Sequence, residues 1–171
     1  HVHVYLYEPD TETLRVAAGT GEAGRVMQQS GHSIPLSARR SLVARAGRSR
    51  QPVLIPDVAL EPDHLPNPLL PLTRSEMAVP LVHGQDLIGV LDVQSERRGA
   101  FSEDIVPVMT TLAGQMAVAI INARAFTAIR QAQEETQAAL DHVARQNRFS
   151  SGVAQFATTL LNRGIDGLGE A

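Results

Sequence analysis

The strongest constraint in this 171-residue sequence is a helical pattern that starts near Ser102 and continues to about Gln146. Ser102 precedes Glu103 and Asp104, and a hydroxyl cap followed by an acidic first turn is typical of a helix start. Neither proline nor glycine interrupts the pattern after Gly114. A helix of this length would measure on the order of 65 Å, far more than one small domain requires. The sequence therefore predicts one domain and a helix that extends beyond it.

One face of this predicted helix repeats at alternating spacings of four and three residues, which is typical of a helix that pairs with a second helix. The seam continues to Val143 and includes polar positions, which weaken a coiled coil but help to fix its register. A lone solvated helix is the alternative. The predicted dimer interface consists of Val108, Leu112, Gln115, Ala119, Asn122, Phe126, Ile129 and Leu140.

Composition excludes several classes of function. The formal net charge is -3, with 15 basic and 18 acidic residues, so there is no basic excess to bind nucleic acid. There is no cysteine, which removes disulfides, thiolate metal sites and cysteine nucleophiles together. The longest apolar run, Met116 to Ile121, is far shorter than the roughly 20 residues of a membrane-spanning helix. We expect a cytoplasmic segment without membrane contact of its own, and a parent protein anchored elsewhere stays open.

The first half of the chain predicts a sheet with short helices. Alternating residues and turn signals indicate a hairpin, and three glycines indicate a loop after it. Ser41 is expected to cap a short helix. The expected elements are strands at 2–7 and 14–18, a loop through Gly19, Gly21 and Gly24, a strand at 33–36, a helix at 41–47 and a strand at 52–55. Because the chain has no initiator Met and opens directly on a strand, we expect it to be part of a longer protein.

Five prolines interrupt residues 56–71, which predicts a long irregular loop. Loops of this length in compact domains are often binding loops or lids, and a solvated connector is the equally weighted alternative. Two apolar runs follow, at 76–82 and 87–94, joined by His83-Gly84-Gln85-Asp86. This is the clearest hairpin signal in the chain, and we expect it at the centre of the sheet.

Several segments, in the same order along the chain, resemble those of GAF domains. They are Ile34-Pro35-Leu36, Pro52-Val53-Leu54-Ile55-Pro56-Asp57, Arg74 to Leu81, Leu87 to Val93 and Ala100 to Asp104, with the apolar helix that follows. The resemblance covers about Val2 to Phe126. It implies an α+β fold with a central antiparallel β-sheet of GAF/PAS type, flanking helices and a long C-terminal signalling helix.

The resemblance also implies a division of the chain. Residues 1–126 form the GAF domain, whose opening helix would precede His1, and residues 127–146 form a signalling or coiled-coil linker helix. Residues 147–171 resemble the first helix of a further GAF repeat, which either packs on this domain or belongs to the next.

In function, the resemblance implies a small-molecule sensor that forms parallel dimers through terminal helices and controls a kinase, cyclase, phosphodiesterase or phosphatase. A bacterial sensor histidine kinase is the expected parent. The alternative is a GAF module that binds no ligand and serves as a dimerisation spacer. A cavity of roughly 300 Å³ or more, lined by residues 56–79, would favour the sensor.

The candidate ligand-binding residues lie on the proline-rich loop and the strand after it. Arg74 would bind an anionic group with its forked guanidinium, and Ser75 would donate a hydroxyl hydrogen bond. Asp57 and His64 would supply polar contacts from the loop. The alternative is structural, with Arg74 and Asp57 paired only to tie the loop to the strand. The full predicted set is Asp57, His64, Arg74, Ser75, Met77 and Val79.

The sequence lacks the residues that catalysis or cofactor binding in related proteins would require. The six histidines have no metal-site spacing, although haem on a single histidine stays open. The GAF-like methionine sulfoxide reductases need catalytic cysteines, bilin-binding relatives normally attach their chromophore to cysteine, and the cyclic-nucleotide pattern is missing. We therefore expect no enzyme activity. Asp92, within an apolar strand, is expected to face solvent because an inward carboxylate would need a partner.

Overall fold

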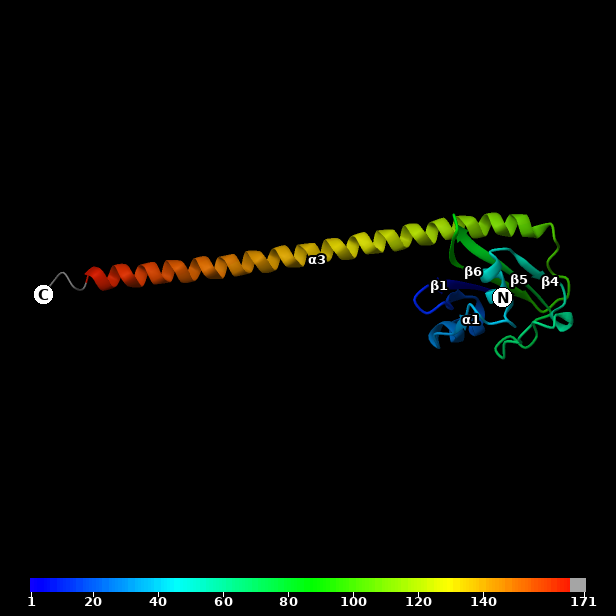
Figure 1. Ribbon diagram of the computed structural model, residues 1–171. Helices are drawn as coiled ribbons and strands as arrows, with labels where there is room; N and C mark the ends of the chain where they lie inside the picture. The colour runs from blue at the N-terminus through cyan, green and yellow to red at the C-terminus, as the bar shows by residue number, and fades with distance from the viewer. Residues whose placement is uncertain (167–171) are drawn as a thin grey trace. The chain divides into compact units, whose positions relative to one another are not determined.

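The computed structural model describes the backbone of residues 1–166 and the side chains of most of them, so the end of the 147–171 segment lies outside the described residues. A six-stranded sheet in the order β3-β2-β1-β6-β5-β4 forms the body of the domain, and every neighbouring pair is antiparallel (Figure 1). The predicted α+β class with a central antiparallel sheet is confirmed. The strands are β1 (Val2–Glu8), β2 (Thr13–Gly19), β3 (Ser33–Pro35), β4 (Val53–Ile55), β5 (Ser75–His83) and β6 (Asp86–Ser95).

Within residues 1–166, four helical elements accompany the sheet, and the cap predicted for the second is confirmed. The Ser41 hydroxyl accepts a hydrogen bond from the Ala44 amide at 3.2 Å. The last helix begins at Ile105 and not at Ser102, because residues 102–104 form a turn in which the Ser102 carbonyl accepts from the Ile105 amide. The elements are α1 (Gly21–Gln29), α2 (Leu42–Ser49), the 3-10 helix η1 (Val58–Leu60) and α3 (Ile105–Asp166).

The loop predicted across Gly19, Gly21 and Gly24 is wrong, because α1 begins within it. Here the glycines permit a close approach between backbones. A β-carbon on Gly24 would lie 2.6 Å from Gly19 Cα and 2.7 Å from its carbonyl oxygen, which no side chain tolerates. Glycine therefore lets α1 pack directly on the end of β2.

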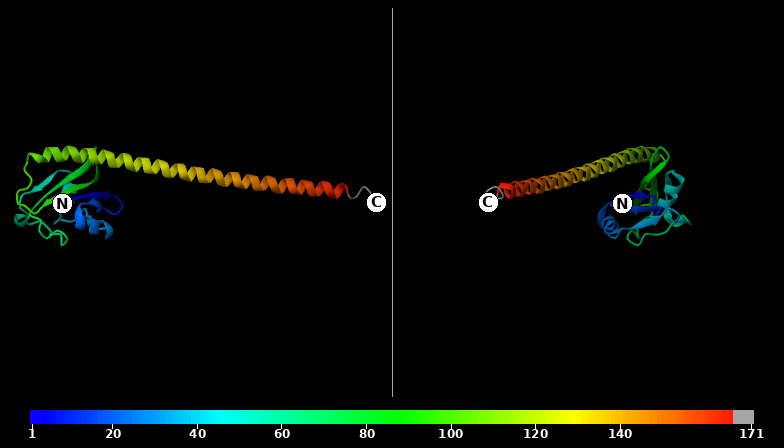
Figure 2. Two further views of the ribbon diagram at one scale, coloured as in Figure 1. Left: turned by 180° about the vertical axis from the view of Figure 1, so that it is seen from behind. Right: turned by 60° about the vertical axis from the view of Figure 1, so that its left-hand side comes forward.

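Both faces of the sheet are covered, as Figures 1 and 2 show. One face packs against α1 and α2, and the opposite face packs against the start of α3. Each fully buried aliphatic side chain contributes roughly 1.5–3 kcal/mol, so the two cores together hold the strands in register. The α1/α2 core includes Leu14, Met27, Val43, Ala78 and Val90. The α3 core includes Met77, Val79, Leu81, Leu91, Ala113 and Ala117.

The chain divides into two compact units, His1–Asn122 and Ala123–Ala171. Helix α3 belongs to both, since its residues 105–122 lie in the first unit and the rest in the second. The predicted helix is unbroken between its start and Val143, as expected. All side chains from Ala123 to Val143 are exposed. The boundary predicted at residue 126 and the linker at 127–146 stay predictions.

One stretch of α3, Ile105–Val143, contains an 18-residue window with a mean hydropathy of 1.6. By length and composition alone this window is apolar enough to cross a membrane, although no continuous apolar run is that long. Within the same stretch Ala113 and Ala117 are fully buried in the α3 core of the first unit. Their burial shows that the start of α3 packs on protein.

Candidate functional site

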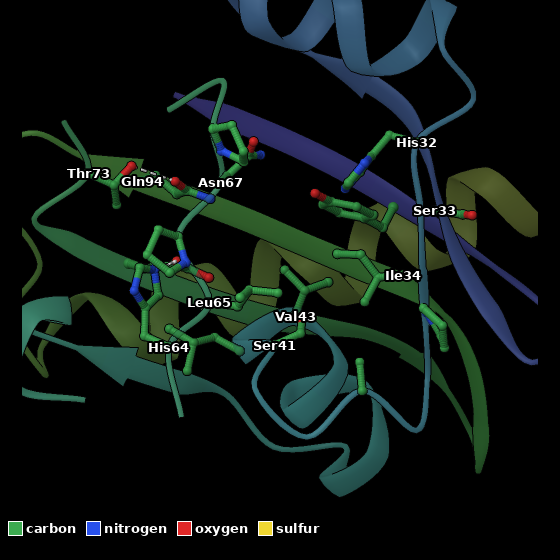
Figure 3. Close-up of a pocket in the computed structure, with 17 residues that line it drawn as sticks. His32, Ser33, Ile34, Ser41, Val43, His64, Leu65, Asn67, Thr73 and Gln94 are labelled. Atoms are coloured by element: carbon green, nitrogen blue, oxygen red, sulfur yellow. Dashed lines mark hydrogen bonds and ion pairs between the residues drawn. The ribbon is translucent and has the colours of Figure 1, made fainter. Parts of the chain in front are cut away.

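A cavity of about 280 Å³ lies between the α1/α2 face of the sheet and the proline-rich loop, as Figure 3 shows. Its volume is close to the roughly 300 Å³ at which small-molecule pockets begin. The sheet forms its floor, α2 and the segment before it form one wall, and the loop forms another. The lining residues are Tyr5, His32, Ser33, Ile34, Pro35, Ala38, Ser41, Leu42, Val43, His64, Leu65, Pro66, Asn67, Pro68, Thr73, Glu76 and Gln94.

Strand alternation decides which residues of β5 reach this cavity. Successive side chains of a strand point to opposite faces. Glu76 lines the cavity and Ala78 packs in the α1/α2 core, whereas Met77 and Val79 are fully buried in the α3 core. The structure therefore places Met77 and Val79 on the face opposite the cavity. Of the six predicted ligand-binding residues, His64 lines the cavity and the other five do not.

The remaining predicted residues hold the loop and the strand in place. Asp57 caps η1 by accepting from the Ala59 amide at 3.1 Å, and its carboxylate pairs with Arg98 at 3.2 Å. The predicted alternative of an Arg74–Asp57 pair is wrong because Arg98 takes that position. The Arg74 amide donates to the Ser95 carbonyl at 2.7 Å, and buried Ser75 donates its hydroxyl to the Arg97 carbonyl at 2.8 Å.

A hydrogen-bonded chain of buried polar groups runs from the cavity wall into the sheet. The Thr73 hydroxyl donates to Gln94 Oε1 at 2.7 Å, and Gln94 Nε2 donates to Asp92 Oδ2 at 2.8 Å. The same Asp92 oxygen lies 3.3 Å from Nδ1 of His3 on β1. Figure 3 shows Thr73 and Gln94 side by side at the cavity. The chain links the cavity wall to the centre of the sheet.

The expectation that Asp92 faces solvent is wrong, since its side chain is fully buried. Asp92 lies on β6, a central strand, and alternation places it on the same face as Val90 and Gln94. Two buried atoms of this chain, Asp92 Oδ1 and His3 Nε2, have no hydrogen-bond partner among the described residues. An unsatisfied buried polar atom typically destabilises a fold by about 1–3 kcal/mol. Stability alone therefore does not explain why these two polar residues are buried here.

Glu76 is the acidic group of the cavity and is 5% exposed. Burial and the nearby Asp92 raise the pKa of its carboxyl well above the ordinary value, and Arg45 opposes the shift. His64 Nε2 lies 3.7 Å from Glu76 Oε2, while burial lowers the pKa of His64. Both shifts favour the neutral forms, so we do not count this contact as an ion pair.

Two aromatic groups complete the cavity floor. Burial, with Asp92 and Glu76 nearby, raises the pKa of the Tyr5 phenol, so it stays protonated and its O–H is available as a donor. The His32 ring meets the Tyr5 ring edge-on with centroids 6.4 Å apart. Burial, followed by nearby His3, lowers the pKa of His32. The cavity thus combines a neutral aromatic floor with one buried acid.

The loop over the cavity contacts α1 and the segment that precedes α2. Arg40 donates to the His64 carbonyl at 3.0 Å, and the Asn67 amide contacts Met27 Sδ at 3.3 Å. Leu65 lines the cavity and is 61% exposed. An apolar side chain in that position is free to close over a bound molecule.

Sequence reasoning missed Tyr5, Glu76, Asp92 and Gln94. On β5 it selected Ser75, Met77 and Val79, whereas the side chains on the cavity face are those one position away, such as Glu76. The available signal was the buried acid itself: Glu76 and Asp92 interrupt otherwise apolar strands, and such residues need a partner. Among the described residues no group of three or more histidine, aspartate or glutamate side chains has a metal-binding arrangement.

Known proteins share this architecture. The family model of the GAF domain matches residues 1–121. The GAF domain of a phosphoenolpyruvate-protein phosphotransferase from Acinetobacter is 24% identical, with a TM-score of 0.60 over 73% of this chain and 72% of that chain. The second GAF domain of DevS from Mycobacterium smegmatis is 22% identical, with a TM-score of 0.56 over 75% of this chain and 84% of that chain.

A third similar structure is the free methionine-R-sulfoxide reductase from Neisseria meningitidis in complex with its substrate. It is 30% identical, with a TM-score of 0.53 over 66% of this chain and 61% of that chain. No curated protein sequence matches this chain. The family match covers more than half of the chain, and the chain belongs to the GAF domain family. It is a domain of the sensory and regulatory kind found in signalling proteins.

Proposed function

We propose that this GAF domain binds a small molecule in the cavity and passes the binding signal through α3 to the output of a bacterial signal-transduction protein. The observation that supports ligand binding most strongly is the cavity itself. It is bounded by a loop with an exposed leucine, and it contains a buried acid, Glu76, whose carboxyl receives no hydrogen bond from the described residues. A spacer domain would gain stability by filling this space with apolar side chains.

The relay depends on strand β5, where neighbouring residues contact different partners. Glu76 lines the cavity, and the next residue, Met77, packs in the core that includes Ala113 and Ala117 of α3. A ligand that moves this part of β5 therefore acts on the packing of α3 within the first unit. If the ligand binds more tightly to one packing of α3 than to another, its binding shifts the population toward that packing.

The output side of the proposal is a homodimer formed along α3. Apolar residues of the predicted seam are exposed in the single chain: Phe126 is 70% exposed, Ile129 59% and Leu140 60%. A second copy of the helix is the partner that such a seam fits best, because both helices present the same spacing. We infer that the parent is a sensor histidine kinase in which α3 leads to the next domain.

We propose binding without catalysis. The reductase from Neisseria meningitidis is named for a reaction on free methionine-R-sulfoxide. The resemblance to such enzymes implies catalytic cysteines, and this sequence has none. The cavity would then serve recognition alone.

Native mass spectrometry of the purified chain tests the proposal. We expect a dimer with a co-purified small molecule, or one that takes up a molecule from a protein-free cell extract. Deletion of residues 126–143 should abolish the dimer. Monomers at high concentration would contradict the relay, and a dimer that survives the deletion would place the interface elsewhere. A dimer that never takes up a small molecule would favour the spacer function.

A further inference from the structure

The buried acid of the cavity has no hydrogen-bond donor. Glu76 is 5% exposed, and no group among the described residues donates a hydrogen bond to its carboxyl. His64 Nε2, at 3.7 Å, lies beyond hydrogen-bond distance. Glu76 lines the cavity, so a donor for its carboxyl can come from a molecule that occupies the cavity.

A second acid lies beside it on the neighbouring strand. In the β5–β6 register Glu76 pairs with Gln94 and Ala78 pairs with Asp92, which places both acids on one face. Gln94 and His3 contact Oδ2 of Asp92, and Oδ1 has no partner. Burial and the nearby Asp92 raise the pKa of Glu76, and a cation near both acids would stabilise the charged form of Glu76.

Basic groups offset the charge of the two acids only in part, through Arg45, which does not line the cavity. Its lining residues include neither lysine nor arginine. The nearby guanidinium groups are engaged elsewhere: Arg45 contacts Glu61 at 3.3 Å, and Arg40 donates to the His64 carbonyl. A phosphate or carboxylate ligand would therefore find no cationic partner among the lining residues, whereas a cation would pair with the Glu76 carboxylate.

Apolar side chains make up much of the remaining lining. They include Ile34, Leu42, Val43 and Leu65. A volume of about 280 Å³ is many times that of a single ion, and no metal-binding cluster occurs among the described residues. The cavity therefore fits an organic cation with a short apolar body.

We propose that the cavity binds a small molecule that carries a protonated amino group, with the ammonium against Glu76 and the apolar body against α2 and the loop. This inference rests on the proposed ligand-binding function and names the class of ligand. The ammonium donates to the Glu76 carboxylate, and the Tyr5 hydroxyl, which faces the same space, is a second polar contact.

Binding exchanges one proton for one cation. The raised pKa of Glu76 means that the empty site holds a proton more readily than an exposed glutamate does. The incoming ammonium stabilises the carboxylate, and the proton leaves to solvent. Asp92, Tyr5, His64 and Arg45 are the other titratable or charged groups that face Glu76, so the exchange is measured as the net proton release of the whole site. Affinity for the amine should fall as the pH is lowered.

Matched pairs of fragments test this inference. The probes are benzylamine, 2-phenylethylamine and n-hexylamine, each with its N-acetyl derivative, which has nearly the same shape but no positive charge. Binding is followed by chemical shift changes in amide NMR spectra of the full chain. At least one amine should bind about tenfold or more tightly than its N-acetyl derivative, which is the effect of one charge-assisted hydrogen bond. Calorimetry in two buffers should show proton release with that amine.

The variant Glu76→Gln should remove this preference and the proton release. The control is Glu22→Gln, which makes the same change at an exposed glutamate of α1 that pairs with Arg25 and does not line the cavity. The control variant should keep the preference. Equal binding within each pair would overturn the amine inference and leave ligand binding standing. Absence of binding by all three amines would also overturn it, and uptake of another molecule from the cell extract would show that only this inference had failed.

Discussion

Gly89 on strand β6 lies so close to the β1 backbone that no larger residue fits there. Its substitution gives a quantitative test of the register between β1 and β6 at the cavity floor. A β-carbon on Gly89 would overlap the carbonyl oxygen of Tyr5 and would lie 3.1 Å from the Tyr5 carbonyl carbon and 3.3 Å from Leu6 Cα. All three atoms are backbone, so no flexible side chain can move aside. Gly89→Ala must therefore shift β1 against β6 at the residue whose ring forms the cavity floor.

Overpacking of this kind costs about 1–3 kcal/mol, and the upper end applies because only backbone can yield. At about 4 °C per kcal/mol for a domain of this size, we expect the melting temperature of Gly89→Ala to fall by about 12 °C. The matched control is Gly114→Ala in α3, where a β-carbon meets nothing within 4 Å. Better helix propensity should stabilise the control by about 1 kcal/mol. Differential scanning calorimetry measures both, and an unchanged or raised melting temperature for Gly89→Ala would refute the register.

Three further predictions concern the acid, the opposite core and the helix. Because the fold raises the pKa of Glu76, the native state keeps a proton that the unfolded state loses above a pH of about 4.5, and the free energy of unfolding falls as the pH rises above that value. Glu76→Gln should reduce this pH dependence in urea titrations at several pH values. An unchanged pH dependence would contradict the raised pKa. Met77→Ala should cost about 2–5 kcal/mol in the same titrations, because Met77 is fully buried in the α3 core; unchanged stability would contradict its place in that core. Replacing Phe126 and Ile129 with serine should lower dimer affinity in analytical ultracentrifugation, since each buried side chain contributes roughly 1.5–3 kcal/mol, and an unchanged dimer would exclude this seam.

Much of the fold could be predicted because its signals are local. The β5–β6 hairpin follows from two apolar runs around a turn at Gly84, and the structure has that hairpin next to the centre of the sheet. Ser41 was expected to cap a helix and does so. The unbroken course of α3 as far as Val143 followed from the absence of proline and glycine between Gly114 and that residue, and the helix continues through Gly152 to Asp166. Helix α1 was missed because glycine usually indicates a loop, whereas here Gly24 provides the contact with β2.

The site was harder to predict because it depends on contacts between distant segments. A shift of one residue moves a whole strand to the other face, and this separates Glu76 in the cavity from Met77 in the α3 core. Asp92 was expected to face solvent because a single strand does not reveal that His3 and Gln94 lie beside it. His64 was found because the proline-rich loop itself indicated a lid.

Thiol protection on the loop tests most directly whether the cavity binds a small molecule. The chain has no cysteine, so Leu65→Cys and Leu60→Cys each introduce a single labelling site. Both leucines are exposed and lie in the proline-rich segment 56–71. Of the two, Leu65 lines the cavity and Leu60 does not. Alkylation of each variant is timed by mass spectrometry with and without a protein-free cell extract of molecules below about 1 kDa, a size that includes pocket ligands.

A ligand in the cavity should slow the alkylation of Leu65→Cys and leave Leu60→Cys unchanged. Equal rates with and without the extract at both positions would contradict ligand binding in this cavity.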